Sequence, residues 1–196
     1  MSLYSIAHKI QGKIPWLWYF IEQTNSCLFT LRYGSKLQSF SFSEVPEGFQ
    51  IIPINSVSVD ELIAFFEHQP EDAFTFFHPH AFDRKSIKRL QKNRSFLAFI
   101  LFDNDNSKIA GYFFDRCFFH GQGFRGRMVD IDYRGRGLGT TMNKLLNDIG
   151  FSIGLRLFET VSRDNIASYR SAISASDVIV LKEMENNEVF LEIVNR

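Results

Sequence analysis

The chain has 196 residues, enough for one domain of ordinary size with a substantial hydrophobic core. Its 22 Lys and Arg residues balance 22 Asp and Glu residues, so the formal net charge is zero. A neutral chain gives no electrostatic basis for a nucleic-acid or anionic-membrane partner, and we expect neither. The 22 phenylalanines fit either an apolar substrate groove or a Phe-rich core, and composition leaves both open.

Cysteine usage and the apolar stretches bear on the compartment. Cys27 and Cys117 are the two cysteines, and without a C-x-x-C pair they predict reduced thiols rather than a disulfide framework. The first residues lack the basic start and apolar run of a signal peptide. The stretches Ile14–Ile21 and Phe96–Phe102 are shorter than the roughly 20 residues of a membrane-spanning helix. We therefore expect a soluble cytoplasmic protein.

Residues 1–48 read as an N-terminal extension that precedes the main domain. Leu28–Tyr33 and Leu37–Phe42 alternate in polarity on either side of Gly34, a pattern that predicts a hairpin. A short apolar run at Phe49–Ile54 predicts a buried strand and opens the domain of residues 49–196.

Two helices are expected next. Ser58 and Glu61 have the spacing of a capping box, and apolar residues follow at helical spacing to about residue 68. Asp83 is expected to cap a second, basic helix that ends near Lys92.

Strands then dominate before the pattern returns to a helix. We expect strands at Phe96–Phe102, Ile109–Phe119 and Arg127–Asp132, with a turn marked by the glycines at positions 121, 123 and 126. After Gly139 the apolar residues fall at helical spacing as far as Ile153, and Gly154 suits the stop of that helix.

The C-terminal segment predicts a strand, a helix and a hairpin. Leu155–Val161 is expected as a strand, Asp164 as the cap of a short helix, and Asp177–Leu181 with Val189–Val194 as the hairpin. The order of elements predicts an α/β protein with a mixed sheet.

The segment after Val129 carries the strongest functional signal. A strand end leads into glycines at 135, 137 and 139, and an amphipathic helix follows. Unpaired amides at the positive end of a helix, with little side chain in the way, form a site for a phosphate or pyrophosphate. Arg134 and Arg136 add positive charge.

Other interpretations of this turn were weighed. A dinucleotide-binding turn needs G-x-G-x-x-G, but the third glycine comes one residue early, at 139. A Walker A loop needs Gly-Lys followed by Ser or Thr, whereas Gly12-Lys13 is followed by Ile14. A glycine-rich turn without a ligand stays open on spacing alone.

The motif Arg134-Gly135-Arg136-Gly137-Leu138-Gly139 resembles the R/Q-x-x-G-x-G/A acetyl-CoA signature of the GNAT N-acetyltransferases, and the preceding Asp132-Tyr133 resembles its usual lead-in. Asn165 resembles the Asn that begins the family's second CoA-contacting helix. The resemblance covers residues 49–194. It implies an α/β (α+β) GNAT fold, in which a mixed, mostly antiparallel sheet is splayed between its central strands and flanked by helices.

What the resemblance implies for the cofactor can be placed on single residues. Amides of the glycine turn would hold the pyrophosphate, the strand end would pair with pantetheine, the Val129 amide would polarise the thioester carbonyl, and Asn165 would contact the pantetheine arm. The expected acetyl-CoA residues are Met128, Val129, Arg134, Gly135, Arg136, Gly137, Leu138, Gly139, Thr140 and Asn165.

The catalytic residues are less well marked. Where many family members carry a catalytic Tyr seven residues after the Asn, this chain has Ala172. Tyr169 and Ser168 are alternative acids, although core packing of Tyr169 is favoured, and a water is the further alternative. Asp130 is a candidate base, with a salt bridge to Arg127 as the structural alternative.

His120 is another candidate base, and the remaining candidates concern the acceptor. Phe77, His78 and His80 are expected to line the acceptor cleft, with core packing of their segment as the alternative. Asp115 is expected at the same cleft, with a surface pair with Arg116 as its alternative. His-x-His without a third ligand is a weak metal pattern, and we expect no metal.

The expected reaction is acetyl or short-acyl transfer from acetyl-CoA to the primary amine of a small molecule. Scattered residues are similar to acyltransferases of surface-polysaccharide pathways, whose acceptors are nucleotide-linked amino sugars. A peptide N-terminus or a small amine is the alternative acceptor, and a non-catalytic CoA-binding module is the alternative function. The protein is expected to be a monomer or a homodimer.

Overall fold

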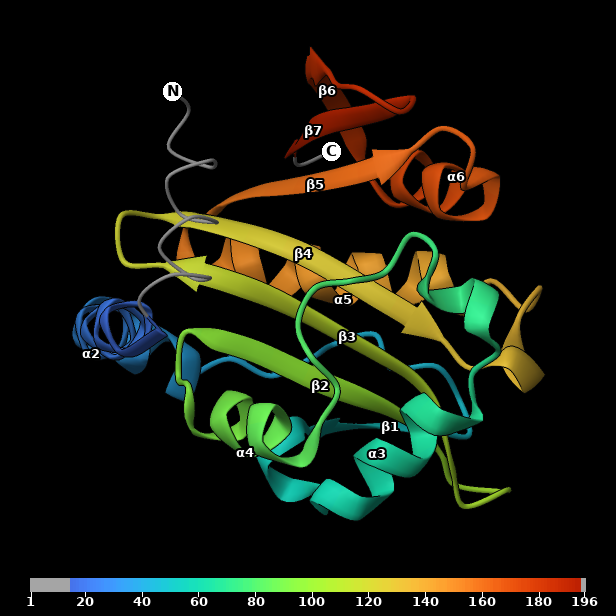
Figure 1. Cartoon of the computed structure of the whole chain (residues 1–196), viewed down its shortest axis with the longest axis horizontal. Helices are drawn as coiled ribbons and strands as arrows, with labels where there is room; N and C mark the ends of the chain where they lie inside the picture. Colours follow the sequence, from blue (N-terminus) through green and yellow to red (C-terminus); the bar gives the residue numbers. More distant parts are fainter. Residues whose placement is uncertain (1–14, 195–196) are drawn as a thin grey trace.

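The computed structural model describes residues 15–194, which form one seven-stranded sheet with helices against it (Figure 1). The expectation about a signal peptide concerns residues 1–14, which lie outside the described residues. The strands are β1 (Phe49–Pro53), β2 (Phe96–Asp103), β3 (Lys108–Phe118), β4 (Gln122–Val129), β5 (Arg156–Ser162), β6 (Asp177–Glu183) and β7 (Glu188–Val194). The helices are α2 (Pro15–Gln38), α3 (Val59–His68), α4 (Arg84–Lys92), α5 (Leu138–Ile153) and α6 (Ile166–Ala175), with short 3-10 turns η1 (Ile54–Ser56), η2 (Glu71–Phe74) and η3 (Ile131–Tyr133).

The sheet has the order β1-β2-β3-β4-β5-β7-β6. Every neighbouring pair is antiparallel except β4 and β5, which are parallel. The expected mixed, mostly antiparallel sheet is therefore confirmed. In Figure 1, α3 and α4 lie in front of the β1–β2 side of the sheet, and α5 lies behind β3 and β4.

The expected hairpin within residues 28–42 is wrong, because helix α2 covers most of this segment. Phe29, Tyr33 and Leu37 lie four residues apart, so they share one face of the helix. Phe29 and Tyr33 are fully or almost fully buried, and all three pack into the hydrophobic cores of the sheet and α5. Six residues of apparent alternation also satisfy this helical spacing, and the core decides between the two.

Helix α2 is held mainly by its buried aromatic face. We expect Phe29→Ala to destabilise the protein by about 3–5 kcal/mol, because a fully buried ring would leave a cavity. Leu31→Ala on the same helix, at a side chain that is 84% exposed, should change stability by less than about 0.5 kcal/mol. Urea unfolding of both variants checks the difference, and equal effects would show that α2 does not share the core.

Most predicted helix ends are confirmed. Ser58 and Glu61 form the capping box of α3, and Asp83 accepts hydrogen bonds from the first amides of α4. Gly154 ends α5 in the left-handed conformation, with φ 87°. The predicted cap of α6 is wrong by one residue: Asn165 caps the helix by accepting from the Ser168 amide at 3.1 Å.

The glycines that were expected to form one turn have different roles. Gly121 lies in the β3–β4 turn with φ 101°, as expected. Gly123 and Gly126 lie within β4, so the predicted turn at these positions is wrong. The ring of Phe114 lies so close to Gly126 that a Cβ there would clash with it. A glycine in a strand therefore marks close packing here.

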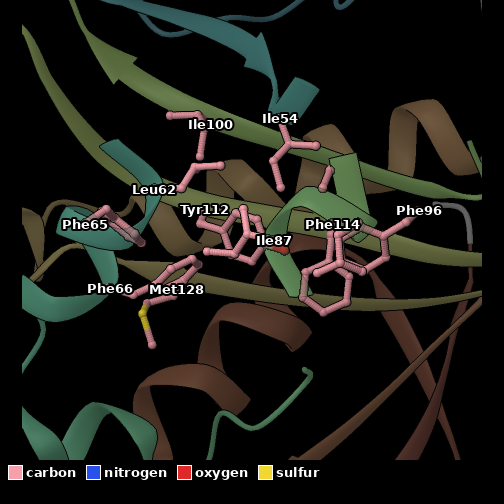
Figure 2. Packing of buried hydrophobic residues seen from close by; sticks show 12 residues of the cluster. Ile54, Leu62, Phe65, Phe66, Ile87, Phe96, Ile100, Tyr112, Phe114 and Met128 are labelled. Carbon is pink, nitrogen blue, oxygen red and sulfur yellow. The ribbon is translucent and has the colours of Figure 1, made fainter. Parts of the chain in front are cut away.

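One hydrophobic core lies between the sheet and helices α3 and α4 (Figure 2). Tyr112 and Phe114 of β3 meet Leu62, Phe66 and other side chains of the covering helices. The Phe96 and Phe114 rings stack with centroids 4.8 Å apart. Much of the unusual phenylalanine content therefore fills this core.

The sheet is incomplete between β4 and β5. Gln122–Phe124 of β4 pairs with Arg156–Phe158 of β5, and the ladder ends there. Beyond this point β5 stays paired with β7 as far as Ser162, while β4 stays paired with β3 as far as Val129. The central strands therefore diverge, as expected, and they leave a gap in the middle of the sheet.

Among residues 15–194, no helix combines the length and the apolar character needed to cross a bilayer.

Candidate active site

The gap between β4 and β5 opens into a cavity of about 690 Å³. Four parts of the chain line it: the segment around η2, the end of β4, the turn that leads into α5, and one face of α6. The lining residues are Asp72, Ala73, Phe76, Phe77, Arg127, Met128, Val129, Tyr133, Arg134, Gly135, Gly137, Leu138, Gly139, Thr140, Asn165, Ala167, Ser168, Arg170, Ser171 and Ser174. Nine of the ten expected cofactor residues are among them, and Arg136 is the exception.

The glycine turn forms one end of the cavity. Gly135 and Gly137 have φ values of 78° and 79°, the left-handed conformation that glycine adopts without strain. A Cβ at either position would meet no atom of residues 15–194 within 4 Å, so the described part of the chain leaves space beside the turn for a ligand. Gly137 is the N-cap of α5 and offers no capping side chain, which leaves the first amides of the helix available to an anion.

Arg134 and Arg136 behave differently at this turn. Arg134 lines the cavity, where its charge faces the glycine turn. Arg136 instead donates to the Asp132 carbonyl at 3.0 Å and lies over the ring of Tyr133. It therefore stabilises the turn from outside the cavity lining.

The end of β4 presents a free backbone donor to the gap. Successive amides of a strand point to opposite sides. The Asp130 amide donates to the carbonyl of Ala110 in β3, at 3.0 Å. The Val129 amide therefore points to the other side, from which β5 has diverged. The Val129 N–H is thus available to a carbonyl oxygen of a ligand in the cavity.

A buried ion cluster joins the diverging strands below the cavity. Glu159 of β5 accepts from Arg125 at 2.6 Å and from Arg127 at 2.8 Å, and both arginines belong to β4. Arg127 also donates to the Ser168 carbonyl and hydroxyl, which ties α6 to the same cluster. The alternative expected for Arg127, a salt bridge with Asp130, is not formed. The cluster fixes the separation of the strands and the position of the helix.

One face of α6 lines the cavity, and part of it escaped the sequence analysis. The face comprises Ala167, Arg170, Ser171 and Ser174, which follow the spacing i, i+3, i+4, i+7. This spacing, counted from Ala167 in the first turn of the helix, is the signal that would have found Arg170. Arg170 and Arg134 are cationic lining residues, in addition to Arg127, which is paired with Glu159.

Asp130 lies outside the cavity lining, so its expected position beside the reacting groups is wrong. It is the N-cap of η3, where it accepts from the Asp132 amide at 3.0 Å. Its second oxygen accepts from the Gln69 side chain at 2.7 Å. His68 and Asp132 bring further ligand atoms to within 4.8 Å of this carboxylate, also outside the lining. Asp130 therefore connects the exit of β4 to the end of α3.

The other two candidates for proton transfer also lie outside the cavity lining. Tyr169 packs against the core of β5 and β7, and the guanidinium of Arg163 lies over its ring. This is the core packing favoured from the sequence. His120 is exposed in the β3–β4 turn, where it stacks on Phe118. In the register of β3 and β4 this turn is at the opposite end from Val129. Neither side chain is placed to serve at the cavity.

Only one of the four expected acceptor residues lines the cavity. Phe77 lines the cavity, whereas His78 and His80 do not. His80 packs among core aromatic rings, donates from Nδ1 to the Ala81 carbonyl at 3.0 Å and accepts from the Tyr112 hydroxyl at 2.9 Å. Burial lowers the pKa of His80 to about 4, so the ring is neutral near pH 7 and holds the segment in place.

Asp115 is fully buried on the α5 side of β3 and does not line the cavity, so its expected position in an acceptor cleft is wrong. Its carboxyl oxygens have no hydrogen-bond partner among the described residues. Burial raises the pKa of Asp115 to about 8, opposed by the charge of Arg125 and aided by that of Glu159. Near pH 7 the native carboxyl keeps its proton.

This buried carboxyl links stability to pH. In the unfolded chain Asp115 ionises near its ordinary pKa of about 4, whereas the native group does so near 8. Its contribution is therefore largest below pH 4 and is lost as pH rises to 8. Between these values we expect the wild type to lose up to about 1.4 kcal/mol per pH unit relative to Asp115→Asn. Urea unfolding of both proteins from pH 5 to 8.5 checks this, and parallel profiles would contradict it.

Neither a protein-family model nor a curated protein matches the sequence. Solved structures do match. Ribosomal-protein-S5-alanine acetyltransferase from Vibrio fischeri superposes with a TM-score of 0.64 at 15% identity, over 80% of this chain and 97% of that one. The chain has the GNAT fold.

Further structures with the GNAT fold extend the comparison. A Salmonella typhimurium protein, yncA, solved with its cofactor acetyl-CoA, matches with a TM-score of 0.59 at 15% identity, over 76% of this chain and 94% of that one. The N-acetyltransferase PseH of Campylobacter jejuni matches with a TM-score of 0.56 at 13% identity, over 76% and 99%. At these identities the likeness concerns the GNAT fold itself.

Proposed function

We propose that the protein transfers an acetyl or short acyl group from acetyl-CoA to the primary amine of a small molecule. The observation that carries the proposal is a single cavity. It joins a glycine turn at the start of α5, the free Val129 amide in the gap of the sheet, and the aromatic segment after η2. An anion site, an oxyanion donor and an acceptor lip thus share one space.

The donor end fits coenzyme A. Amides from Gly135 to Gly139 would hold the pyrophosphate, whereas the Thr140 amide donates to the Gly137 carbonyl at 3.0 Å. Arg134 and Arg170 would supply positive charge beside the pyrophosphate. The exposed backbone of β4 would pair with the amides of pantetheine. The side-chain oxygen Oδ1 of Asn165 caps α6, so the side-chain nitrogen Nδ2 is the group left for a ligand.

The chemistry needs a donor to the developing oxyanion and a route for protons. The thioester supplies an activated acyl carbon: the nitrogen of the neutral amine bonds to it, the C–S bond breaks, and coenzyme A leaves as a thiol after a net transfer of one proton from that nitrogen to the sulfur. The Val129 N–H is placed to stabilise the negative charge that develops on the carbonyl oxygen. Tyr133 is the one tyrosine of the described lining, and its hydroxyl donates to Asp103 at 2.8 Å. Water is therefore the proposed carrier of protons to and from the reacting groups.

The acceptor classes to compare are amino sugars, nucleotide-linked amino sugars, polyamines and peptides. Similar folds act on or bind different molecules: one neighbour is a ribosomal-protein-S5-alanine acetyltransferase, and AAC(6')-Ib was solved with paromomycin and acetyl-CoA. The deciding experiment is a thiol-release assay with acetyl-CoA and this panel. Release that depends on an acceptor supports the enzyme.

A non-catalytic CoA-binding module is the second candidate. It is favoured by Ala172, which is fully buried where many family members carry a catalytic Tyr. Tight CoA binding with no acceptor-dependent thiol release across the panel would select this candidate. Absence of both binding and release would overturn both proposals.

A further inference from the structure

We infer that Asp72 is the carboxylate that binds the acceptor's ammonium group, and that the acceptor is a cationic amine with an apolar or flat body. The inference rests on the proposed acyl transfer and names its acceptor class. It differs from the expectation that His78, His80 or Asp115 contacts the acceptor, since those three side chains lie outside the cavity lining.

Asp72 is the one acidic residue among the described residues that line the cavity. It is exposed at the start of η2, and no side-chain hydrogen bond or ion pair of Asp72 is found within residues 15–194. The cationic lining residues Arg127, Arg134 and Arg170 come from β4, the glycine turn and α6. The cavity therefore has an acidic group on its η2 side and basic groups on the other elements.

The segment that carries Asp72 is anchored at both ends. Before it, the buried side chain of Gln69 donates to Asp130 and to the Phe65 carbonyl and accepts from the Ile131 amide at 3.0 Å. After it, Phe77 packs on Phe82 and Phe114, with centroids 6.2 and 6.4 Å apart. Fixed ends hold the carboxylate at the cavity, so a ligand need not order the whole segment on binding.

Two aromatic side chains complete this side of the cavity. Phe76 and Phe77 line it together with Asp72, and Phe76 is half exposed. An ammonium group is attracted both by a carboxylate and by the face of an aromatic ring. The same rings offer apolar surface to the rest of the acceptor. An acceptor with a carboxylate or phosphate at this position would meet the charge of Asp72 unfavourably.

The test uses a pair of probes with equal chain length, 1,4-diaminobutane and 4-aminobutanoate. In thiol-release assays with acetyl-CoA, Asp72→Asn should raise the KM for 1,4-diaminobutane at least tenfold and leave kcat within about threefold. The wild type should favour the diamine by at least tenfold in kcat/KM, and Asp72→Asn should reduce this preference. The KM effect should shrink in 1 M salt, where charges are screened beyond about 3 Å.

Glu71→Gln is the matched control, because Glu71 is the neighbouring exposed carboxylate and does not line the cavity. It should leave the KM for the diamine within twofold. Equal KM values for wild type, Asp72→Asn and Glu71→Gln would overturn the inference while leaving acyl transfer intact.

Direct calorimetric titration separates the two proposals. Binding of 1,4-diaminobutane to the free protein and to the CoA-saturated protein is measured for wild type and Asp72→Asn, with the expected loss of at least tenfold in the variant. Coenzyme A affinity should be the same in both proteins. Absence of CoA binding would overturn the proposed function; absence of a diamine site in wild type, or equal diamine affinity in both proteins, would overturn the role of Asp72.

Discussion

Replacing Gly137 by glutamate is expected to lower the affinity for coenzyme A at least a hundredfold. Gly137 is the N-cap of α5 and lines the cavity, so the new carboxylate would stand where the pyrophosphate is proposed to lie. It would crowd that anion and repel it, at the helix end that otherwise attracts negative charge. Calorimetric titration with coenzyme A measures the loss.

The variant also places a side chain at a φ of 79°, which costs about 1–2 kcal/mol of stability in its own right. Gly154→Glu is the matched control: Gly154 is also left-handed, lies at the other end of α5, and has Lys36 Nζ 3.7 Å from the position of its added Cβ. It should carry a similar folding cost and keep wild-type affinity. Wild-type affinity in Gly137→Glu would show that the phosphate site is elsewhere.

Glu159→Gln is expected to destabilise the protein by about 3–5 kcal/mol. Its carboxylate is the partner that Arg125 and Arg127 share, and all three side chains are at most 5% exposed. The positive charges of the two arginines repel each other. Arg125 also lies near Asp115, whose protonated carboxyl carries no negative charge to compensate it. Removal of the negative charge therefore leaves buried positive charge without compensation. Urea unfolding measures the effect.

The exposed pair between Arg156 and Glu192 provides the comparison. Arg156 donates to Glu192 at 2.7 and 2.9 Å, but its side chain is 62% exposed. Glu192→Gln should therefore cost less than about 1 kcal/mol. If the two glutamine variants lose the same stability, the buried cluster does not hold the diverging strands together.

Features that depend on neighbouring residues could be predicted from the sequence. A capping box needs Ser58 and Glu61 three positions apart, and the structure contains it. The glycine turn before α5 is equally local, which is why the sequence alone could predict that these residues line the cavity. The order of strands and helices followed from the same kind of signal.

Features decided by distant contacts could not be predicted. The alternation in residues 28–33 suited a strand, but a core formed by residues more than 80 positions later selects the helical face of Phe29 and Tyr33. In the sequence, the carboxylate of Asp130 was a candidate base. In the fold, it accepts a hydrogen bond from the side chain of Gln69, a contact that the sequence does not show. Asp72 carries no sequence motif, and it lines the same cavity as α6 because of the path that the chain takes between α3 and α4.

The early end of the β4–β5 ladder leaves inner edges on both β4 and β5, in addition to the two outer strands of the sheet. Outer edges present unpaired backbone groups to any passing chain, a hazard for aggregation. The edge at Val129 has the same unpaired groups, but η2 and α6 line the space in front of it. The protein thus keeps unpaired backbone groups inside its own fold. A molecule reaches them only if it fits between the lining elements η2 and α6, so its width matters as well as its chemistry.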